Sequence, residues 1–155
     1  MSTSAEGRSM SARLLLARVG LETFAFPIAD VMEAVEAPTV TPLALAPAGV
    51  AGQCTHRDRL VPVLDGGVML GVPRAPGEGV LLLIDTAAGR LGLRVDDVLD
   101  MVEVDPARRR ALPATGGAMT AMLEDVIDLG DGIAGAVAMD ALRAAMAARL
   151  TTEAA

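Results

Sequence analysis

The sequence repeats itself: residues 14–36 align with residues 81–103 without a gap. The leucine triplet at 14–16 returns at 81–83, and apolar positions match apolar positions through most of the two segments. A period of about 67 residues exceeds the roughly 20 to 50 residues of a solenoid repeat. It suits two related small lobes in one body, and the seam between such lobes is a place where a partner can dock.

Composition excludes several classes of protein. With 155 residues, 52% of them hydrophobic, the chain has the size and apolar content of one folded domain with a substantial core, not of a disordered segment. It contains no lysine, which excludes a Walker-A lysine and a Schiff-base lysine. A net charge of −7, the absence of Trp and Tyr, and only two Phe argue against nucleic acid, which needs cations for phosphates and aromatic rings for bases.

The cellular compartment is indicated by features that the sequence lacks. No apolar run approaches the roughly 18 to 20 residues that a membrane span needs. The first residues lack the basic and then apolar pattern of a signal peptide. The single cysteine, Cys54, cannot form an internal disulfide, so nothing requires an oxidising compartment. We therefore expect a cytoplasmic protein.

The order of short apolar segments predicts a mainly β fold. We expect a flexible tail at 1–12, a single domain at 13–150 whose second lobe begins near residue 79, and a short tail at 151–155. Turn signals divide the domain into expected strands at 13–19, 23–28, 39–45, 49–55, 60–64, 80–86, 90–95, 102–104, 122–129 and 133–139. Helical turns are expected at 31–35, 65–71 and 98–101, and an amphipathic helix at 141–150, with Leu142 and Met146 facing inward and Arg143 and Arg149 facing water. Many short strands at regular spacing favour a barrel-type β architecture.

Catalytic and metal chemistry find little support. His56, the only histidine, stands two residues from Cys54 on the same strand face, so a Cys–His pair is conceivable, but a buried thiol beside a solvated imidazole is the simpler interpretation. Asp125, Asp128 and Asp131 are three residues apart, whereas a calcium loop spaces its first ligands by two. One histidine and one cysteine cannot build a zinc site without distant carboxylates. We therefore expect no catalytic site, no metal and no cofactor, but a binding protein with an apolar recognition surface rimmed by arginines and acids.

An ordered set of motifs then suggests a family. FAFPI at 24–28 leads into DVMEAV at 30–35, GVAG at 49–52 leads to Arg57, and VPVLD at 61–65 precedes GLRVDDV at 92–98. Together these motifs resemble the CheW family, the coupling proteins of bacterial chemotaxis, over roughly residues 13–150. The resemblance implies two intertwined five-stranded barrels similar to SH3 domains, followed by a C-terminal helix.

The resemblance also implies a role without chemistry. Such proteins bridge the cytoplasmic tips of methyl-accepting chemoreceptors to the regulatory domain of the histidine kinase CheA. They are not enzymes, and they reach the inner membrane only indirectly, through receptor arrays.

Receptor contact in the family maps onto particular residues of this chain. A valine and a glutamate after the second strand match Val31 and Glu33, and a glycine and an arginine on the next hairpin match Gly52 and Arg57. In such proteins the arginine can pair with the glutamate. On the equivalent turn of the second lobe stand Val98 and Met101, which we expect to line the other wall of a groove between the lobes.

The chain departs from the family pattern in two places. The hairpin usually reads Asn-Leu-Arg-Gly, whereas residues 55–58 read THRD. Asp58 tolerates a left-handed turn but adds a negative charge that competes for the Arg57 guanidinium. Asp125 stands where a glycine is frequent in the second lobe. Three alternatives stay open: a coupler of a pilus or other non-flagellar pathway, the detached regulatory domain of a kinase, and a small hydrolase that uses Cys54 or His56.

Overall fold

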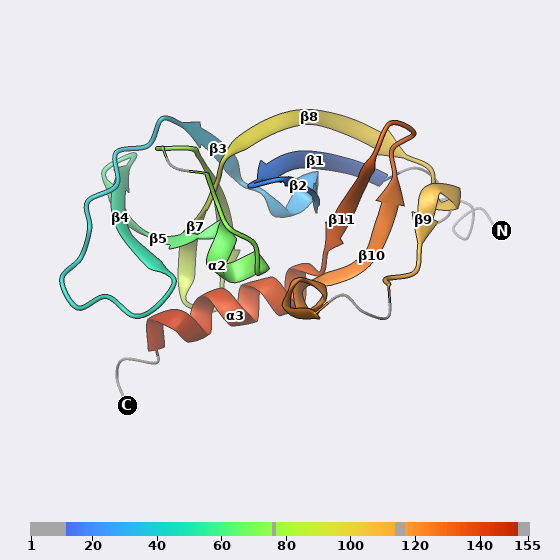
Figure 1. The fold of residues 1–155 in the computed structure, drawn as a ribbon. Helices are drawn as coiled ribbons and strands as arrows, with labels where there is room; N and C mark the ends of the chain where they lie inside the picture. The colour runs from blue at the N-terminus through green and yellow to red at the C-terminus, as the bar shows by residue number, and fades with distance from the viewer. Residues whose placement is uncertain (1–11, 76, 114–116, 152–155) are drawn as a thin grey trace, which may run out of the picture.

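The computed structural model describes residues 12–75, 77–113 and 117–151. The tails expected at 1–12 and 151–155 therefore fall outside the described residues, apart from Ala12 and Thr151. Eleven strands and two helices make up most of the described part (Figure 1). The strands are β1 (Ala12–Val19), β2 (Glu22–Pro27), β3 (Glu33–Glu36), β4 (Val50–His56), β5 (Arg59–Asp65), β6 (Val80–Thr86), β7 (Gly89–Val95), β8 (Asp97–Val104), β9 (Arg109–Arg110), β10 (Leu123–Asp128) and β11 (Ile133–Val137). The helices are α2 (Gly66–Leu70) and α3 (Met139–Thr151), with 3₁₀ turns at Ile28–Asp30, Pro106–Arg108 and Gly117–Met122.

The strands form two sheets, and the prediction of a mainly β fold is confirmed. A six-stranded sheet has the order β8-β1-β2-β11-β10-β9, and a five-stranded sheet has the order β3-β6-β7-β5-β4. The expected pair of five-stranded barrels needs correction, because β9 adds a sixth strand to one sheet and neither sheet closes within the described residues. The five-stranded sheet curls until the segment after β3 meets β4, where Thr41 and Gln53 form an isolated bridge.

The two sequence repeats exchange their third strands. In the first repeat β3 leaves β2 and pairs with β6, while in the second β8 leaves β7 and pairs with β1, arching over the top of Figure 1. The registers correspond: Glu33 lies opposite Leu83, and its counterpart in the second repeat, Asp100, lies opposite Leu16. The lobes are therefore intertwined as expected, and neither sheet coincides with one half of the chain.

The duplication extends further than the sequence reveals. Beyond the third strand the matching positions continue at a slightly longer spacing: β4 and β5 correspond to β10 and β11, and α2 begins at Gly66 as α3 begins at Met139. Both hairpins carry a bulge at the same point, between Val50 and Gly52 in one and between Leu123 and Asp125 in the other. The backbone plan is repeated even where the residue identities have diverged.

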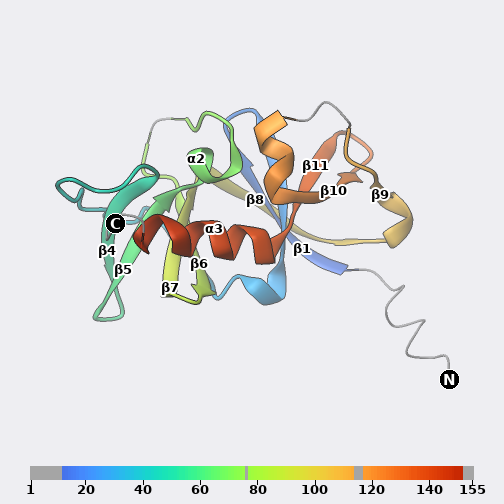
Figure 2. The same cartoon turned by 90° about the horizontal axis from the view of Figure 1, so that it is seen from below.

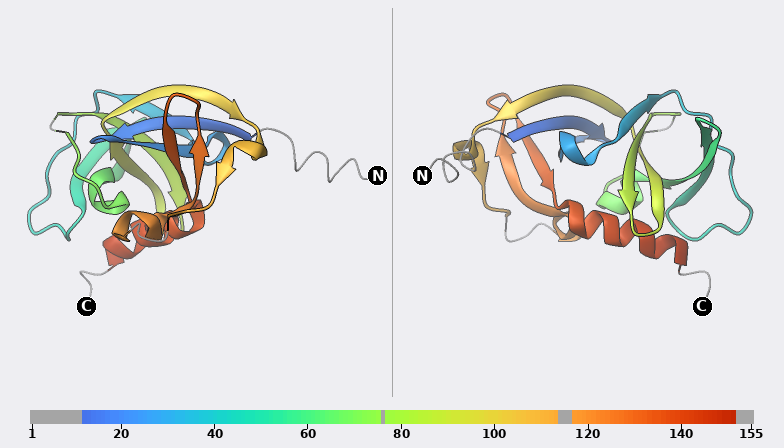
Figure 3. Two further views of the ribbon diagram at one scale, coloured as in Figure 1. Left: turned by 45° about the vertical axis from the view of Figure 1, so that its right-hand side comes forward. Right: turned by 180° about the vertical axis from the view of Figure 1, so that it is seen from behind.

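The space between the two sheets is a packed core. The largest apolar cluster joins Leu15, Phe24 and Phe26 of one sheet to Leu82 and Leu93 of the other. The helix α3 begins where β11 ends and runs beneath the five-stranded sheet (Figures 2 and 3), and it adds the fully buried Leu142 and Met146, as expected. Each lobe also holds a smaller cluster within its own curled sheet. The expected groove between the lobes is therefore filled by apolar side chains along their facing surfaces.

Two expected helical turns are strands. Residues 31–35 form no helix, because a 3₁₀ turn ends at Asp30 and β3 follows, with the Met32 amide donating to the Leu83 carbonyl at 2.8 Å. Residues 98–101 are likewise part of the continuous strand β8. Both segments gain ladder hydrogen bonds from a strand distant in sequence, and this outweighs the local helical pattern. Residues 39–45, expected as a strand, contribute only the Thr41 bridge.

The ends of the helices also differ from expectation. The predicted short helix at 65–71 is confirmed as α2, because the Asp65 carboxylate accepts from the Gly67 amide at 2.7 Å and Gly71 ends the helix with φ 78°. The helix α3 begins before Asp140, which lies in its first turn. Arg143, expected to face water, pairs with Asp30 and donates to the Asp85 carbonyl.

Candidate functional site

The tip of the β4–β5 hairpin is bonded to strand β3 at the opposite edge of the same sheet. Arg57 Nη2 lies 3.2 Å from both carboxylate oxygens of Glu33, and Arg57 Nε lies 3.3 Å from Oε1. The ring of His56 adds a contact of 3.1 Å between Nε2 and the same Oε1. Glu33, His56 and Arg57 thus form a cluster, which we call the hairpin clasp, and the pairing implied for Glu33 and Arg57 is present.

The clasp depends on an unusual turn. Arg57 has φ 50° and Asp58 has φ 64°, so both central residues of the two-residue turn are left-handed. Two left-handed residues are typical of the turn that matches the twist of a tight hairpin, and aspartate accepts this conformation better than most residues. Asp58 therefore preserves the turn in place of the usual glycine.

Hydrogen bonds favour the ionised form of the Glu33 carboxylate. The hydrogen bonds from Arg57, and secondarily from His56, lower the pKa of Glu33 below its ordinary value. Arg57 remains largely exposed, so its guanidinium is oriented by the pair and still reachable by a partner.

Gly52 allows two backbone segments to approach each other closely in the lobe that carries the hairpin clasp. It occupies the bulge of β4 with φ 152°, and a Cβ atom there would lie 2.2 Å from the Thr41 carbonyl oxygen. Only glycine allows the chain after β3 to cross this strand so closely. The structure thus gives Gly52 a direct role in shaping the lobe that presents Glu33 and Arg57.

The other expected contact residues lie apart from the clasp. Val31 and Val98 are partly buried and pack against the core between the sheets. Met101 is 61% exposed on β8, the edge strand of the other sheet. Of the six residues implied by the resemblance, the structure brings Glu33 and Arg57 into contact with each other and distributes the rest over both lobes.

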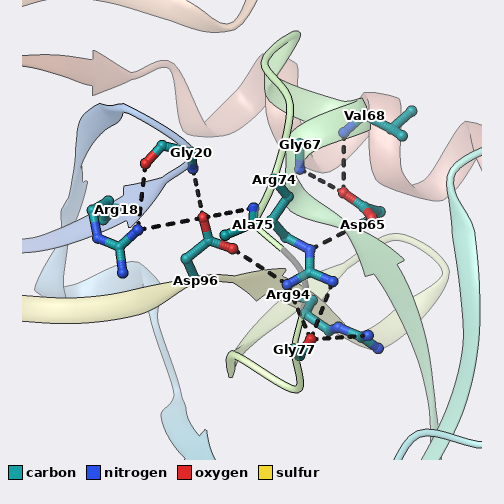
Figure 4. Close-up of polar contacts among 10 residues, drawn as sticks. All are labelled: Arg18, Gly20, Asp65, Gly67, Val68, Arg74, Ala75, Gly77, Arg94 and Asp96. Carbon is teal, nitrogen blue, oxygen red and sulfur yellow. Dashed lines mark hydrogen bonds and ion pairs between the residues drawn. The ribbon is translucent and has the colours of Figure 1, made fainter.

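A buried carboxylate fastens the two lobes near the linker between the repeats (Figure 4). The Asp96 side chain is 3% exposed. It accepts hydrogen bonds from the Gly20 amide at 2.6 Å, the Ala75 amide at 3.1 Å and Arg74 Nη1 at 3.3 Å, and Arg18 lies 3.7 Å away. These partners come from the β1–β2 turn and from the linker, so Asp96 holds the linker against the six-stranded sheet.

Arg74 extends this network to the other sheet. Its Nε lies 3.6 Å from the carboxylate of Asp65, the residue that caps α2, and its Nη atoms donate to the Gly77 carbonyl. Arg94 also reaches that carbonyl, and its own burial, together with the charge of Arg74, lowers the pKa of Arg94. The sequence did not indicate this network, because its members come from segments that are far apart along the chain. A lone arginine between prolines and glycines was the available signal.

The structure gives no support to the alternative of a hydrolase that uses Cys54 or His56. Cys54 is buried, and its Sγ lies 3.6 Å from the Thr55 carbonyl, while His56 turns to Glu33. Among the residues that the structure describes, no three His, Cys, Asp or Glu side chains converge closely enough to hold a metal ion. In the same residues, no helix is long and apolar enough to cross a membrane.

Comparison with known proteins supports the arrangement described above. Residues 13–145 match the family described as CheW-like domain. The fold is similar to the crystal structure of the scaffolding protein TtCheW from Thermoanaerobacter tengcongensis, with a TM-score of 0.72 and 21% sequence identity, over 83% of this chain and 89% of that chain. No curated protein matches the sequence.

Proposed function

The chain belongs to the CheW-like domain family of scaffold and adaptor proteins, and from that membership we propose that it couples chemoreceptors to the kinase CheA. In this proposal one surface holds the cytoplasmic tip of a methyl-accepting chemotaxis protein, another holds the regulatory domain of CheA, and the chain performs no chemistry. It would work in the cytoplasm, attached to the inner membrane only through receptor arrays.

The observation that supports receptor contact best is the hairpin clasp. Glu33 and Arg57 come from opposite edges of one sheet, and their contact fixes an otherwise flexible arginine on an exposed turn. A guanidinium held in place by a carboxylate loses less conformational entropy when a partner binds. The clasp therefore presents Arg57 ready for a helix of the receptor tip.

The remaining contacts of the proposal lie on both lobes. Val31 would support the receptor helix beside Glu33, and Gly52 would keep the β4 backbone in its close crossing. Val98 and Met101 would provide a second contact on β8, where Met101 offers an exposed apolar side chain.

A binding experiment with two partners tests the proposal. The purified protein is mixed with a receptor cytoplasmic fragment and, separately, with the regulatory domain of CheA, and co-sedimentation and calorimetry measure each affinity. Arg57→Glu should weaken receptor binding about tenfold or more, because the new carboxylate loses the pair with Glu33 and repels it. Its affinity for the kinase domain should change less than about twofold, since no kinase contact is assigned to Arg57.

The matched control is Arg108→Glu, the same charge reversal on an exposed arginine of the other lobe. It should leave receptor affinity unchanged, and circular dichroism should show both variants folded. Failure of the unaltered protein to bind either partner would refute the coupling role.

A further inference from the structure

The mouth of the five-stranded sheet is ringed by one polar residue from each strand. The curled sheet encloses an apolar cluster that includes Cys54, Val61 and Leu83, with Val35 packed against it. Two residues further along each strand, on the same face, the side chains become polar. In the sheet order β3-β6-β7-β5-β4, these are Glu33, Asp85, Arg90, Arg59 and His56.

The registers place these side chains next to one another. Asp85 lies opposite Arg90 in the β6–β7 ladder, and His56 lies opposite Arg59 in the β4–β5 ladder. In the sheet β5 lies between β7 and β4, and Arg59, Arg90 and His56 line one hollow. The polar rim is therefore a consequence of strand order, and it joins positions that are far apart in the sequence.

Most charges on the rim are already paired. Arg90 Nε donates to the Asp85 carboxylate at 2.7 Å and Arg90 Nη2 donates at 3.1 Å, and this bond lowers the pKa of Asp85 and raises that of Arg90. Glu33 is held by Arg57 and His56. Within the part of the chain that the structure describes, the side chain of Arg59 has neither a hydrogen bond nor an ion pair. Arg57 and Arg90 are thus paired with acids, and Arg59 is the one arginine at this mouth whose guanidinium is unpaired among the described residues.

A hollow opens beside the unpaired guanidinium of Arg59. It has a volume of about 430 Å³ and is lined by His56, Arg57, Arg59, Leu60, Val61 and Arg90. Leu60 is 64% exposed, so the lining of the hollow also includes an accessible apolar side chain. An adjoining hollow is lined by Arg59, Asp85 and Arg90. Cations thus gather at one mouth of a chain whose net charge is −7.

We propose that this mouth binds a single carboxylate of a partner protein, a Glu or Asp side chain that has an apolar neighbour. The carboxylate pairs with Arg59 in the hollow that Arg90 and His56 also line, and the neighbour packs on Leu60. One carboxylate matches the one unpaired guanidinium, whereas a phosphate dianion would exceed its charge. The inference rests on the proposed function, because it specifies the chemistry of the receptor segment that lies beside the hairpin clasp.

Peptide titration tests the pocket without the receptor. The ¹⁵N-labelled full chain is titrated with the capped tripeptide acetyl-Leu-Glu-Leu-amide, in parallel with acetyl-Leu-Gln-Leu-amide, to about 10 mM, since contacts this small bind in the millimolar range. The Glu peptide should shift the amide signals of Arg59, Leu60 and Arg90. The Gln peptide should bind about fivefold more weakly, because it lacks the charge-assisted hydrogen bond.

Two variants give the control. Arg59→Gln should lower the affinity for the Glu peptide about fivefold and remove the preference over the Gln peptide, while Arg108→Gln should change neither. Equal binding of the two peptides, no shift at the rim, or an unchanged preference in Arg59→Gln would overturn the pocket.

The receptor fragment separates this inference from the proposed function. Arg59→Gln should weaken binding of the fragment severalfold, and by less at high salt, because screening reduces exposed charge pairs. Receptor binding that is unaffected by Arg59→Gln would refute the pocket and leave the coupling role intact. Glu-peptide binding at the rim without any receptor binding would support the pocket and refute the coupling role.

Discussion

The two hairpins that complete the lobes occupy equivalent places in the duplicated backbone and differ in charge. Three arginines surround the mouth of the five-stranded sheet, and the equivalent positions of the six-stranded sheet carry none. The pairs, in order, are Arg57 and Gly130, Arg59 and Gly132, and Arg90 and Thr23. Because the backbone plan is common to both lobes, binding specificity must come from side chains that only one lobe possesses.

The comparison also separates what the backbone requires from what a partner requires. The bulge recurs in both hairpins, but Gly52 lies under the crossing chain, whereas the equivalent Asp125 has room for a side chain that pairs with Arg109 at 2.8 Å. The frequent glycine of the second lobe is therefore dispensable here, since β9 supplies a cation for an acid at that position.

The largest expected effect tests the asymmetry between the two repeats at Asp96, whose counterpart in the first repeat is Ala29. Asp96→Ala should lower the free energy of unfolding by about 4 kcal/mol, because it leaves the buried Arg74 and two backbone amides without their acceptor. Urea denaturation measures the loss.

The neighbouring Asp97, which is exposed, gives the control. Asp97→Ala should cost less than about 0.5 kcal/mol, as is usual for surface sites. Equal effects of the two substitutions would show that the network around Asp96 does not fasten the lobes.

A smaller effect compares the two bulges. Gly52→Ala should destabilise the protein by about 3 kcal/mol, since its Cβ would overlap the Thr41 carbonyl and the φ is unfavourable for alanine. Asp125→Ala should cost about 1 kcal/mol, the contribution of one partly exposed ion pair. Thermal unfolding of the two variants should rank them in this order, and the reverse order would contradict the assigned roles.

The smallest effect concerns the acid of the hairpin clasp. Arg57→Ala removes the main cause of the lowered pKa of Glu33, so that pKa should rise toward its ordinary value while the His56 contact still holds it down. A depressed pKa means that the clasp stabilises the fold above the pKa of the unfolded chain and loses this contribution as the pH falls through the folded value.

NMR titration of the Glu33 carboxyl carbon, in the unaltered protein and in Arg57→Ala, measures the change in the pKa of Glu33. Arg108→Ala is the control and should leave it unchanged. A pKa of Glu33 that is the same with and without Arg57 would show that the pair does not persist in solution.

Sequence reasoning predicted those parts of the fold that depend on neighbours along the chain. The repeat, the hairpins and the short helix expected at 65–71 follow from local patterns and are present. The segments at 31–35 and 98–101 were wrong as helical turns, because each pairs with a strand that belongs to the other repeat. Local propensity does not contain that information.

The candidate site also has a part that could be predicted from the sequence and a part that could not. The resemblance to a known family indicated Glu33 and Arg57, and the structure places them in contact. The rim residues Arg59 and Arg90 could not be recognised, because only the order of the strands in the sheet makes them neighbours. The Asp96 network was hidden for a similar reason, since its partners come from the β1–β2 turn and the linker.

The exchange of third strands sets an order for assembly during synthesis. The five-stranded sheet is built from residues 33–95, so it can be completed once that stretch has left the ribosome. The hairpin of β1 and β2 emerges first, yet it must wait for β8 and β11 before both of its edges are covered. The strands β1 and β2, which are synthesised before the others, are thus among the last to have both edges paired. A hairpin whose edges stay exposed in this way is the part of a nascent chain that most needs a chaperone.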